Sequence, residues 1–397
     1  MCESKSALAT SSPKSMLVHI CCSVDSHYFL QELQKLYPDT RLMGFFYNPN
    51  IHPYEEYLLR LQDVKRSCAR LGISLIEGDY TLQDWLEAIK GLEEEREKGA
   101  RCNVCFDVRL ETSAQMALML GVNHFSTTLL SSPMKEQEVL RKQGGAIGEK
   151  YGLEFVYLNV RAQGGVEKQN ALAKRDKLYR QNYCGCKFAL NAQREVQNKP
   201  CMELISSLDK QIHPASIAQR LELFAQRDKL ELQEQNYHLL QQSLQTYLLL
   251  RGVVRMGNKT LKSLILKRSM SKKITLKDLE VHTITLKSTL AEEILRARYS
   301  IPIEDTRIAL GLSVKDETLF LDTEGVARLL GAPLRPLEQL TLSYAQELYI
   351  REKLVGAESI QPIVIIQDLD LLKNAHSPII LEIVAEFFTH KNFYLLN

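Results

Sequence analysis

Cysteine pairs are the feature of this sequence with the clearest chemical meaning. Three pairs stand out, and they are Cys21 with Cys22, Cys102 with Cys105, and Cys184 with Cys186. Closely spaced thiolates select zinc or iron–sulfur centres, because each bound sulfur is deprotonated by a soft metal ion. These six cysteines exceed the four ligands that one zinc ion or one cluster needs. The pattern therefore predicts metal binding with more cysteine ligands than a single site needs.

The adjacent pair Cys21 and Cys22 has a further property. Neighbouring residues in an extended loop direct their side chains apart, so these two thiols can serve two different metals. Asp25 follows closely and can add an oxygen ligand to a site that must stay chemically open. The simpler alternative is a closed zinc site with four thiolate ligands and two spare thiols. Cys68 falls on the apolar stripe of a helix and is expected to be a core residue.

Composition limits the other possibilities. The chain has 397 residues, 45% hydrophobic and 25% charged, with a net charge of only +2, so any RNA-binding surface must be local. All nine cysteines lie at or before Cys201, which places the chemistry in the first half. The apolar stretch Met16–Cys22 is too short for a signal peptide or a spanning helix, so a cytoplasmic protein without a membrane partner is expected. In that reducing compartment, the cysteines favour metal or redox chemistry over disulfides.

The elements that position these residues alternate between strand and helix. Helical spacing joins Tyr57 to Leu71, and Asp107–Leu120 is a second amphipathic pattern. Alternation of this kind predicts an α/β fold with a doubly wound, mostly parallel sheet of the HUP or Rossmann-like type. Such sheets bind ligands at the carboxyl ends of their strands, where Cys21 and Asn48 fall. The expected strands are Met16–Ile20, Leu42–Tyr47, Ile73–Glu77, His124–Thr128 and Phe155–Asn159.

Three regions are expected along the chain. Residues 1–15 form a disordered tail, 16–196 a metal-binding catalytic α/β domain, and 197–397 a C-terminal accessory region of unknown function, helical and then α/β. The Gln- and Leu-rich segment from Gln197 to Leu250 is expected to be helical. Further on, the sequence predicts a helix at Leu337–Leu354 and strands at Thr318–Leu321, Pro362–Gln367 and Phe393–Leu396. Every candidate ligand precedes residue 197, so the metal site is expected to be independent of the second half.

Several stretches in order resemble the QueH family of epoxyqueuosine reductases. They cover about residues 17–190 and are Ile20–Ser26, Tyr47–Pro53 with Glu56, Tyr57 and Arg60, Arg101–Cys105, Thr127–Pro133, and Leu178–Cys186. One departure concerns the first motif, where many members look like Cys-Cys-Ala-Pro-Cys. Here Ser23-Val24-Asp25 follows the cysteine pair, which replaces a thiolate by a harder oxygen ligand.

The resemblance implies a reaction and its cofactors. The family removes the epoxide oxygen from epoxyqueuosine in the anticodon of tRNA, with electrons from an external donor. It implies a [4Fe–4S] cluster beside a mononuclear iron, although spacing alone does not say which four cysteines bind the cluster. Asp25 is expected at the open iron, and Tyr183 is a candidate proton donor. The proposed metal ligands are Cys21, Cys22, Asp25, Cys102, Cys105, Cys184 and Cys186.

Candidate substrate contacts come from polar and basic residues near these motifs. Asn48, Asn50 and His52 follow the second strand and can hydrogen-bond the modified base, although Asn and Pro also form turns without any ligand. Residues 161–187 hold seven Lys or Arg against two acids, a segment that can follow phosphates or can simply be a solvated helix face. The other expected contacts are Arg60, Thr128, Lys174, Arg175 and Arg180.

Two other functions compete with this hypothesis. Ser23-Val24-Asp25-Ser26 resembles the end of the phosphate loop of PP-loop enzymes that thiolate tRNA. Cys22 and Ser23, however, replace the paired glycines that let the backbone approach phosphate. The second alternative is not an enzyme but a zinc-stabilised RNA-binding module, in which the cysteines only hold the fold.

Overall fold

The computed structural model of the chain describes residues 14–199, 201–204, 215–276, 279–287, 306–313, 315–373 and 377–396. The expected tail lies outside the described residues up to residue 13, and so does Cys2. The chain forms two compact units. The first contains residues 1–205, 216–240 and 393–397, and the second contains 206–215 and 241–392.

A five-stranded sheet organises the first unit. Its strands are β1 (Ser15–His19), β2 (Arg41–Phe46), β3 (Ser74–Glu77), β4 (His124–Thr127) and β5 (Glu154–Phe155). They lie in the order β3-β2-β1-β4-β5, and every neighbouring pair is parallel. This confirms the predicted doubly wound α/β fold. The strand order reverses between β1 and β4, and the carboxyl ends at such a switch point form the usual binding crevice.

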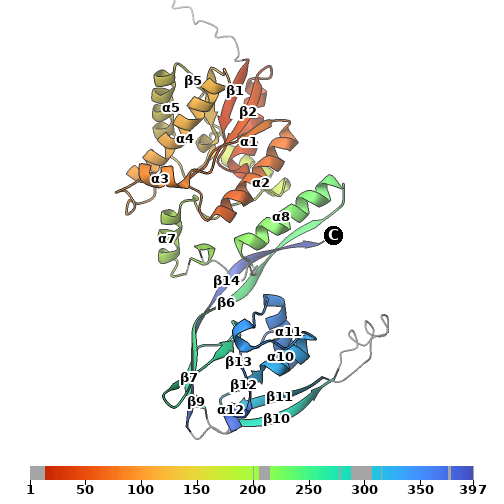
Figure 1. Cartoon of the computed structure of the whole chain (residues 1–397). Coiled ribbons are helices and arrows are strands. Elements are labelled where there is room, and N and C mark those ends of the chain that lie inside the picture. Colours follow the sequence, from red (N-terminus) through yellow and green to blue (C-terminus); the bar gives the residue numbers. More distant parts are fainter. Residues whose placement is uncertain are drawn as a thin grey trace, which may run out of the picture. The chain divides into compact units, whose positions relative to one another are not determined.

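Helices cover both faces of this sheet. Figure 1 shows α1 and α2 on one side and α4 and α5 on the other. The 3-10 turn η1 (Thr128–Ser131) directly follows β4. The helices of this unit are α1 (Ser23–Leu36), α2 (Tyr54–Leu71), α3 (Leu82–Ala88), α4 (Ala100–Met119), α5 (Gln137–Tyr151), α6 (Gly165–Arg175), α7 (Lys187–Val196) and α8 (Ile217–Leu232).

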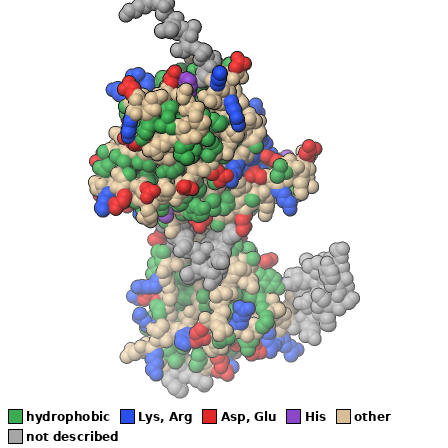
Figure 2. Space-filling view, turned by 45° about the horizontal axis from the view of Figure 1, so that its top comes forward, with side chains coloured by type: hydrophobic (Ala, Val, Ile, Leu, Met, Phe, Trp, Pro, Cys, Tyr) green, Lys and Arg blue, Asp and Glu red, His purple; other side chains and the backbone are tan. Residues whose placement is uncertain are grey.

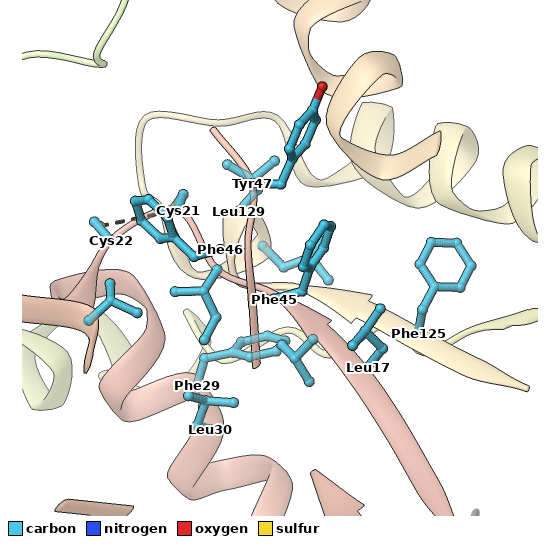
Figure 3. Close-up of a cluster of buried hydrophobic side chains, with 14 of the residues drawn as sticks. Leu17, Cys21, Cys22, Phe29, Leu30, Phe45, Phe46, Tyr47, Phe125 and Leu129 are labelled. Carbon is cyan, nitrogen blue, oxygen red and sulfur yellow. Dashed lines mark hydrogen bonds between the residues drawn. The ribbon is translucent and has the colours of Figure 1, made fainter. Parts of the chain in front are cut away.

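The main core lies between the sheet and these helices. Leu17, Phe29 and Phe125 are fully buried in it, and Cys68 packs there as expected. Figure 3 shows Cys21 and Cys22 at one edge of the same cluster, with the contact between their sulfurs marked. The first cysteine pair thus lies where the apolar core gives way to the carboxyl ends of the strands.

Helix α8 packs on α2 within the first unit. Arg66 on α2 makes a bidentate ion pair with Glu231, with both N–O distances 2.7 Å. Arg227, which is fully buried, lies 2.8 Å from the buried carboxylate of Asp63 on α2. A neighbouring apolar contact joins Phe224 of α8 to the ring of Tyr179. Part of the region expected to be accessory is therefore built into the first unit.

The second unit contains two sheets, with orders β10-β11-β12-β13-β8 and β7-β6-β14-β9. Its strands are β6 (His238–Met256), β7 (Lys259–Leu261), β8 (Ser263–Ile265), β9 (Lys272–Leu276), β10 (Leu279–Leu286), β11 (Thr306–Ser313), β12 (Thr318–Asp322), β13 (Ile363–Ile366) and β14 (Ile379–Leu396). Its helices include α10 (Thr323–Leu330), α11 (Tyr344–Leu354) and α12 (Asp370–Lys373). The 3-10 turn η4 (Leu337–Gln339) also lies in this unit, whereas η2 (Met202–Leu204), the first residues of β6 and the last residues of β14 belong to the first unit.

The expectation of helix through Leu250 was wrong, because the segment is helical only in α8 and then forms the long strand β6. The β-branched pair Val253 and Val254 favours a strand. Val254 is fully buried in the core of the second unit, and its partner across the strand pair is Leu261. Tertiary packing therefore decides this segment. No helix among the described residues has the length and apolar character needed to cross a membrane.

Candidate metal site

Three helix N-termini carry the cysteine pairs to one region. Cys22 immediately precedes α1, Cys102 and Cys105 lie in the first turns of α4, and Cys186 caps α7 by accepting from the Ala189 amide at 3.4 Å. The positive end of a helix dipole favours an anionic thiolate, which partly offsets the cost of burying one. All cysteines among the described residues are free thiols.

Cys21, Cys22 and Asp25 form a first group, with one potential ligand atom from each lying within 4.8 Å of the others. Cys21 Sγ lies 3.9 Å from Cys22 Sγ and 3.6 Å from Asp25 Oδ2. Burial raises the pKa of Asp25, although hydrogen bonds from Cys22, Cys21 and Gln169 oppose the rise. A buried carboxylate beside two thiols is a set of mixed sulfur and oxygen donors that suits a metal ion.

The other four cysteines, Cys102, Cys105, Cys184 and Cys186, make up the second group, although no three of their sulfurs lie within 4.8 Å of one another as the atoms of the first group do. Burial raises the pKa of the Cys102 thiol, and Cys184 and Cys105 add to the rise. Burial likewise raises the pKa of Cys186 to about 12, again with contributions from Cys184 and Cys105. Thiols that raise one another's pKa in this way lie close together, and binding of a soft metal would relieve the repulsion between their thiolates.

Two buried cations lie among these thiols. Lys135 Nζ donates to Cys184 Sγ at 3.0 Å. Burial opposes ionisation of Cys184, but Lys135 and Arg109 outweigh it and hold the pKa of this thiol below its usual value. Arg109 lies one turn after Cys105 on α4, and its buried Nη2 has no hydrogen-bond partner in the described structure. A buried unpaired donor is costly, and an anionic metal–thiolate group would satisfy it.

The donor set therefore fits a cluster and a second metal ion better than it fits a single closed zinc site. The first group holds two thiols and a carboxylate within 4.8 Å of one another, and four further thiols lie outside it, while one tetrahedral zinc needs four ligands. The excess of potential ligands and the unpaired Nη2 of Arg109 are both consistent with an anionic metal centre larger than one ion. Such a centre would be held by the sulfurs of the second group, next to the mixed donors of the first.

Three side chains hydrogen-bond to the first group, namely Thr128, which was expected as a substrate contact, and Gln169 and Gln181, which were not among the expected site residues. The Cys21 amide donates to Thr128 Oγ1 at 3.2 Å, and Gln181 Nε2 donates to Cys22 Sγ at 3.0 Å. Gln169 Nε2 donates to Asp25 Oδ1 at 2.9 Å. Gln181 lies in a motif that resembles the family, but Gln169 carries no local signal, because it is a polar residue on an ordinary amphipathic helix.

Asn48, Asn50 and His52 follow β2, as expected. Asn48 Nδ2 donates to the Ile20 carbonyl at 2.8 Å, which ties this loop to the end of β1. The side-chain oxygens of Asn48 and Asn50 are buried without a hydrogen-bond partner. The His52 amide donates to the Gly185 carbonyl at 2.8 Å, and burial lowers the pKa of its imidazole, assisted by Lys187. The loop thus brings the second strand and the third cysteine motif together.

Arg60 and Tyr183 hold the third cysteine motif in place. Arg60 pairs with Glu56 at 2.8 Å and donates to the carbonyls of Tyr183 and Cys184 at 3.1 and 3.0 Å. The Tyr183 hydroxyl donates to the His52 carbonyl at 2.6 Å, and burial raises the pKa of this phenol strongly. The described contacts of both residues are therefore internal to the protein.

The basic candidates Lys174, Arg175 and Arg180 are exposed and do not join the thiols. Arg175 pairs with Asp176 at 2.8 Å, and Arg180 donates to Asn170 at 2.7 Å. On the face drawn in Figure 2, Lys and Arg side chains are interspersed with acidic ones instead of forming one patch. Any contact of these three residues with RNA phosphates would take place on the surface.

The fold and site define a class of protein, namely a doubly wound α/β unit with buried cysteines beside a carboxylate at its switch point. The model of the family epoxyqueuosine reductase QueH matches residues 16–192. An epoxyqueuosine reductase QueH of Helicobacter pylori is 41% identical over 393 residues, which covers 96% of this chain and 100% of that protein. The chain therefore belongs to the QueH family of epoxyqueuosine reductases, which are oxidoreductases.

Two shorter relatives match only part of the chain. The epoxyqueuosine reductase QueH of Thermotoga maritima is 36% identical and covers 46% of this chain and 93% of its own length. That of Histophilus somni is also 36% identical and covers 48% of this chain and 79% of its own length. The Helicobacter relative, in contrast, extends through the second unit as well.

Proposed function

We propose that this chain reduces epoxyqueuosine in tRNA to queuosine, using a [4Fe–4S] cluster and an adjacent mononuclear iron. The reaction removes the epoxide oxygen as water and consumes two electrons and two protons, with the electrons coming from an external donor. The observation that carries the proposal is the group of Cys21, Cys22 and Asp25, whose potential ligand atoms lie within 4.8 Å of one another directly after β1, beside the switch point of the sheet. Four further thiols lie outside this group, and Cys184 and Cys105 contribute to the raised pKa values of Cys102 and Cys186.

The two groups suggest how the ligands divide. The second group, Cys102, Cys105, Cys184 and Cys186, supplies the four thiolates that a cluster needs. Cys21, Cys22 and Asp25 remain for the single iron, and three protein ligands leave a metal open to substrate. When bound, the cluster supplies single electrons, and the iron acts as a Lewis acid toward the epoxide oxygen.

Residues of the chain would bind and orient the substrate. The unpaired amide oxygens of Asn48 and Asn50 can accept hydrogen bonds from substrate hydroxyls, because both oxygens are buried without a donor. Thr128 lies against Cys21 and closes the site on the β4 side. Lys174 and Arg180 are exposed cations that can contact RNA phosphates, which would weaken binding as salt increases.

Anaerobic purification with metal analysis tests this proposal. The protein should be brown and should hold more iron than labile sulfide, because the cluster contributes equal amounts of the two. With a low-potential reductant it should convert epoxyqueuosine-containing tRNA to the queuosine form, as measured by analysis of the nucleosides. Cys105→Ser should lose the cluster and the activity, whereas Cys201→Ser, outside both groups, should retain them. Stoichiometric zinc without sulfide would overturn the proposal.

A further inference from the structure

A buried hydrogen-bonded chain lies behind the first group and consists of Asp25, Gln169 and Ser131. Gln169 Nε2 donates to Asp25 Oδ1 at 2.9 Å, and Ser131 Oγ donates to Gln169 Oε1 at 2.7 Å. The three side chains come from α1, α6 and η1. Asp25 is 7% exposed, Gln169 3% and Ser131 0%, so water does not compete for these bonds.

The chemistry of the three groups fixes their orientation. An ionised carboxylate only accepts hydrogen bonds, so the amide of Gln169 must present its nitrogen to Asp25. Its oxygen then faces Ser131, whose hydroxyl can donate. A flipped amide would bring two acceptors together at Asp25, which is unfavourable in a buried site. Ser131 therefore determines which end of the amide Asp25 meets, although it does not touch Asp25 itself.

This arrangement treats the two oxygens of Asp25 differently. Oδ1 is engaged by Gln169, whereas Oδ2 lies 3.6 Å from Cys21 Sγ, on the side of the thiols. One carboxylate oxygen is thus held by the protein and the other is turned toward the other potential ligands. A free carboxylate, in contrast, could rotate or present both oxygens to a metal.

We propose that Gln169 and Ser131 are positioning residues, which hold Asp25 so that Oδ2 alone binds the iron beside Cys21 and Cys22. This inference rests on the proposed function, because it concerns the same iron. Binding through one oxygen leaves a coordination position for the substrate oxygen. Partners that orient a metal ligand through a hydrogen bond typically account for about 10–100-fold in metal affinity.

The test uses the full chain, purified anaerobically with its cluster. Iron and labile sulfide are measured, and the excess of iron over sulfide counts the iron outside the cluster. Fe²⁺ titration then gives the affinity of that site in Ser131→Ala, Gln169→Ala and Ser131→Thr. Ser126→Ala is the matched control, because Ser126 is also fully buried at the end of β4 but donates to the Val156 carbonyl.

Ser131→Ala and Gln169→Ala should keep the sulfide content and bind the extra Fe²⁺ about 10–100-fold more weakly. Ser131→Thr, which keeps the hydroxyl, and Ser126→Ala should bind it as the unmodified chain does. Unchanged affinity in both Ser131→Ala and Gln169→Ala overturns the proposal. An equal loss in Ser126→Ala also overturns it, because the effect would then be general destabilisation. Absence of excess iron in the unmodified chain would instead overturn the proposed metal centre itself.

Discussion

Two hypotheses about Asp25 predict different effects of its substitution. In one it binds a metal ion, and in the other it only stabilises the start of α1. It lies in the first turn of α1, where an acid also favours the helix through the dipole. Its described contacts, however, are with the side chains of Gln169 and Cys21. These contacts favour a ligand whose orientation is fixed over a residue that only caps a helix.

Asp25→Ala should remove the excess iron and the activity while leaving sulfide unchanged, because four thiolates remain for the cluster. Asp25→Cys should retain excess iron with an altered rate, since it restores a thiolate at this position. A helix cap alone would instead cost about 0.5–2 kcal/mol of stability with metal content unchanged. The measurements are iron, sulfide and thermal unfolding, and full iron and activity in Asp25→Ala would remove this residue from the site.

The sequence reveals the candidate metal ligands better than it reveals the side chains that hydrogen-bond to them. Cys102 and Cys105 are recognisable because a soft-metal pair needs close spacing, which is a local property. Gln169 is not recognisable, because its partner Asp25 is distant in sequence and only the packing of α6 against α1 brings them together. The division of the thiols into two groups likewise depends on tertiary structure.

At the scale of the elements, most strands of the first sheet could be predicted because their signal is local in the sequence. Strands β1 to β4 differ from their expected bounds by only one residue at either end, because buried parallel strands are short apolar runs between polar turns. Strand β5 is shorter than expected, and β6 was missed altogether. Both depend more on their neighbours in the fold than on their own periodicity.

Gly165 tests how strongly the site depends on the placement of α6. A Cβ at this first residue of the helix would overlap the Val160 carbonyl oxygen. Gly165→Ala should therefore shift α6 with Gln169, cost about 1–3 kcal/mol of stability, and lower the excess iron. Gly145→Ala, at an open position on α5, is the control and should leave the iron unchanged while raising stability by about 0.5–1 kcal/mol, because alanine favours a helix interior over glycine. Wild-type iron in Gly165→Ala would show that α6 tolerates displacement.

The attachment of α8 to α2 should depend on pH. Burial alone would raise the pKa of Glu231, but hydrogen bonds from Arg66 and Tyr237 outweigh it and lower the pKa from 4.5 to about 2. Because the folded-state pKa is depressed, the stabilisation is complete above about pH 4.5 and is lost as pH falls toward 2.

Glu231→Gln should therefore lower the unfolding midpoint at pH 7 and reduce its decline between pH 4.5 and 2. Thermal unfolding across this range measures the effect. Glu222→Gln, an exposed carboxyl on the same helix, is the matched control. An identical pH dependence in Glu231→Gln and the unmodified chain would contradict a stabilising role for this ion pair.

At the scale of the whole molecule, α8 follows residue 197 in the sequence but belongs to the unit that carries the cysteine pairs. Asp63 accepts hydrogen bonds from the Ser23 hydroxyl and from the Tyr179 amide, the latter at 2.7 Å, and it forms an ion pair with Arg227 of α8 at 2.8 Å. Ser23 follows the first cysteine pair, and Tyr179 precedes the third. A carboxylate on α2 thus links both motifs to a helix beyond residue 197.

Two truncated chains test this dependence, one ending at residue 199 and one at residue 236, after α8. The shorter chain loses Arg227, which leaves Asp63 a buried carboxylate without this partner, and breaking such a pair costs about 3–5 kcal/mol. It also uncovers Leu59 and Tyr179, which Phe224 covers. We therefore expect the longer fragment to retain iron and sulfide and the shorter one to lose much of both.

Arg227→Met in the full chain distinguishes the effect of the Arg227–Asp63 ion pair from the effect of the apolar contacts that α8 makes. It should destabilise the first unit by a similar amount while keeping most of the apolar contact, and it should lower metal content less than the shorter truncation does. Metal analysis of soluble protein is the proper measurement, because newly exposed apolar surface alone can reduce solubility. Equal iron and sulfide in the fragments ending at 199 and 236 would show that the metal site forms without α8, as the distribution of cysteines alone suggested.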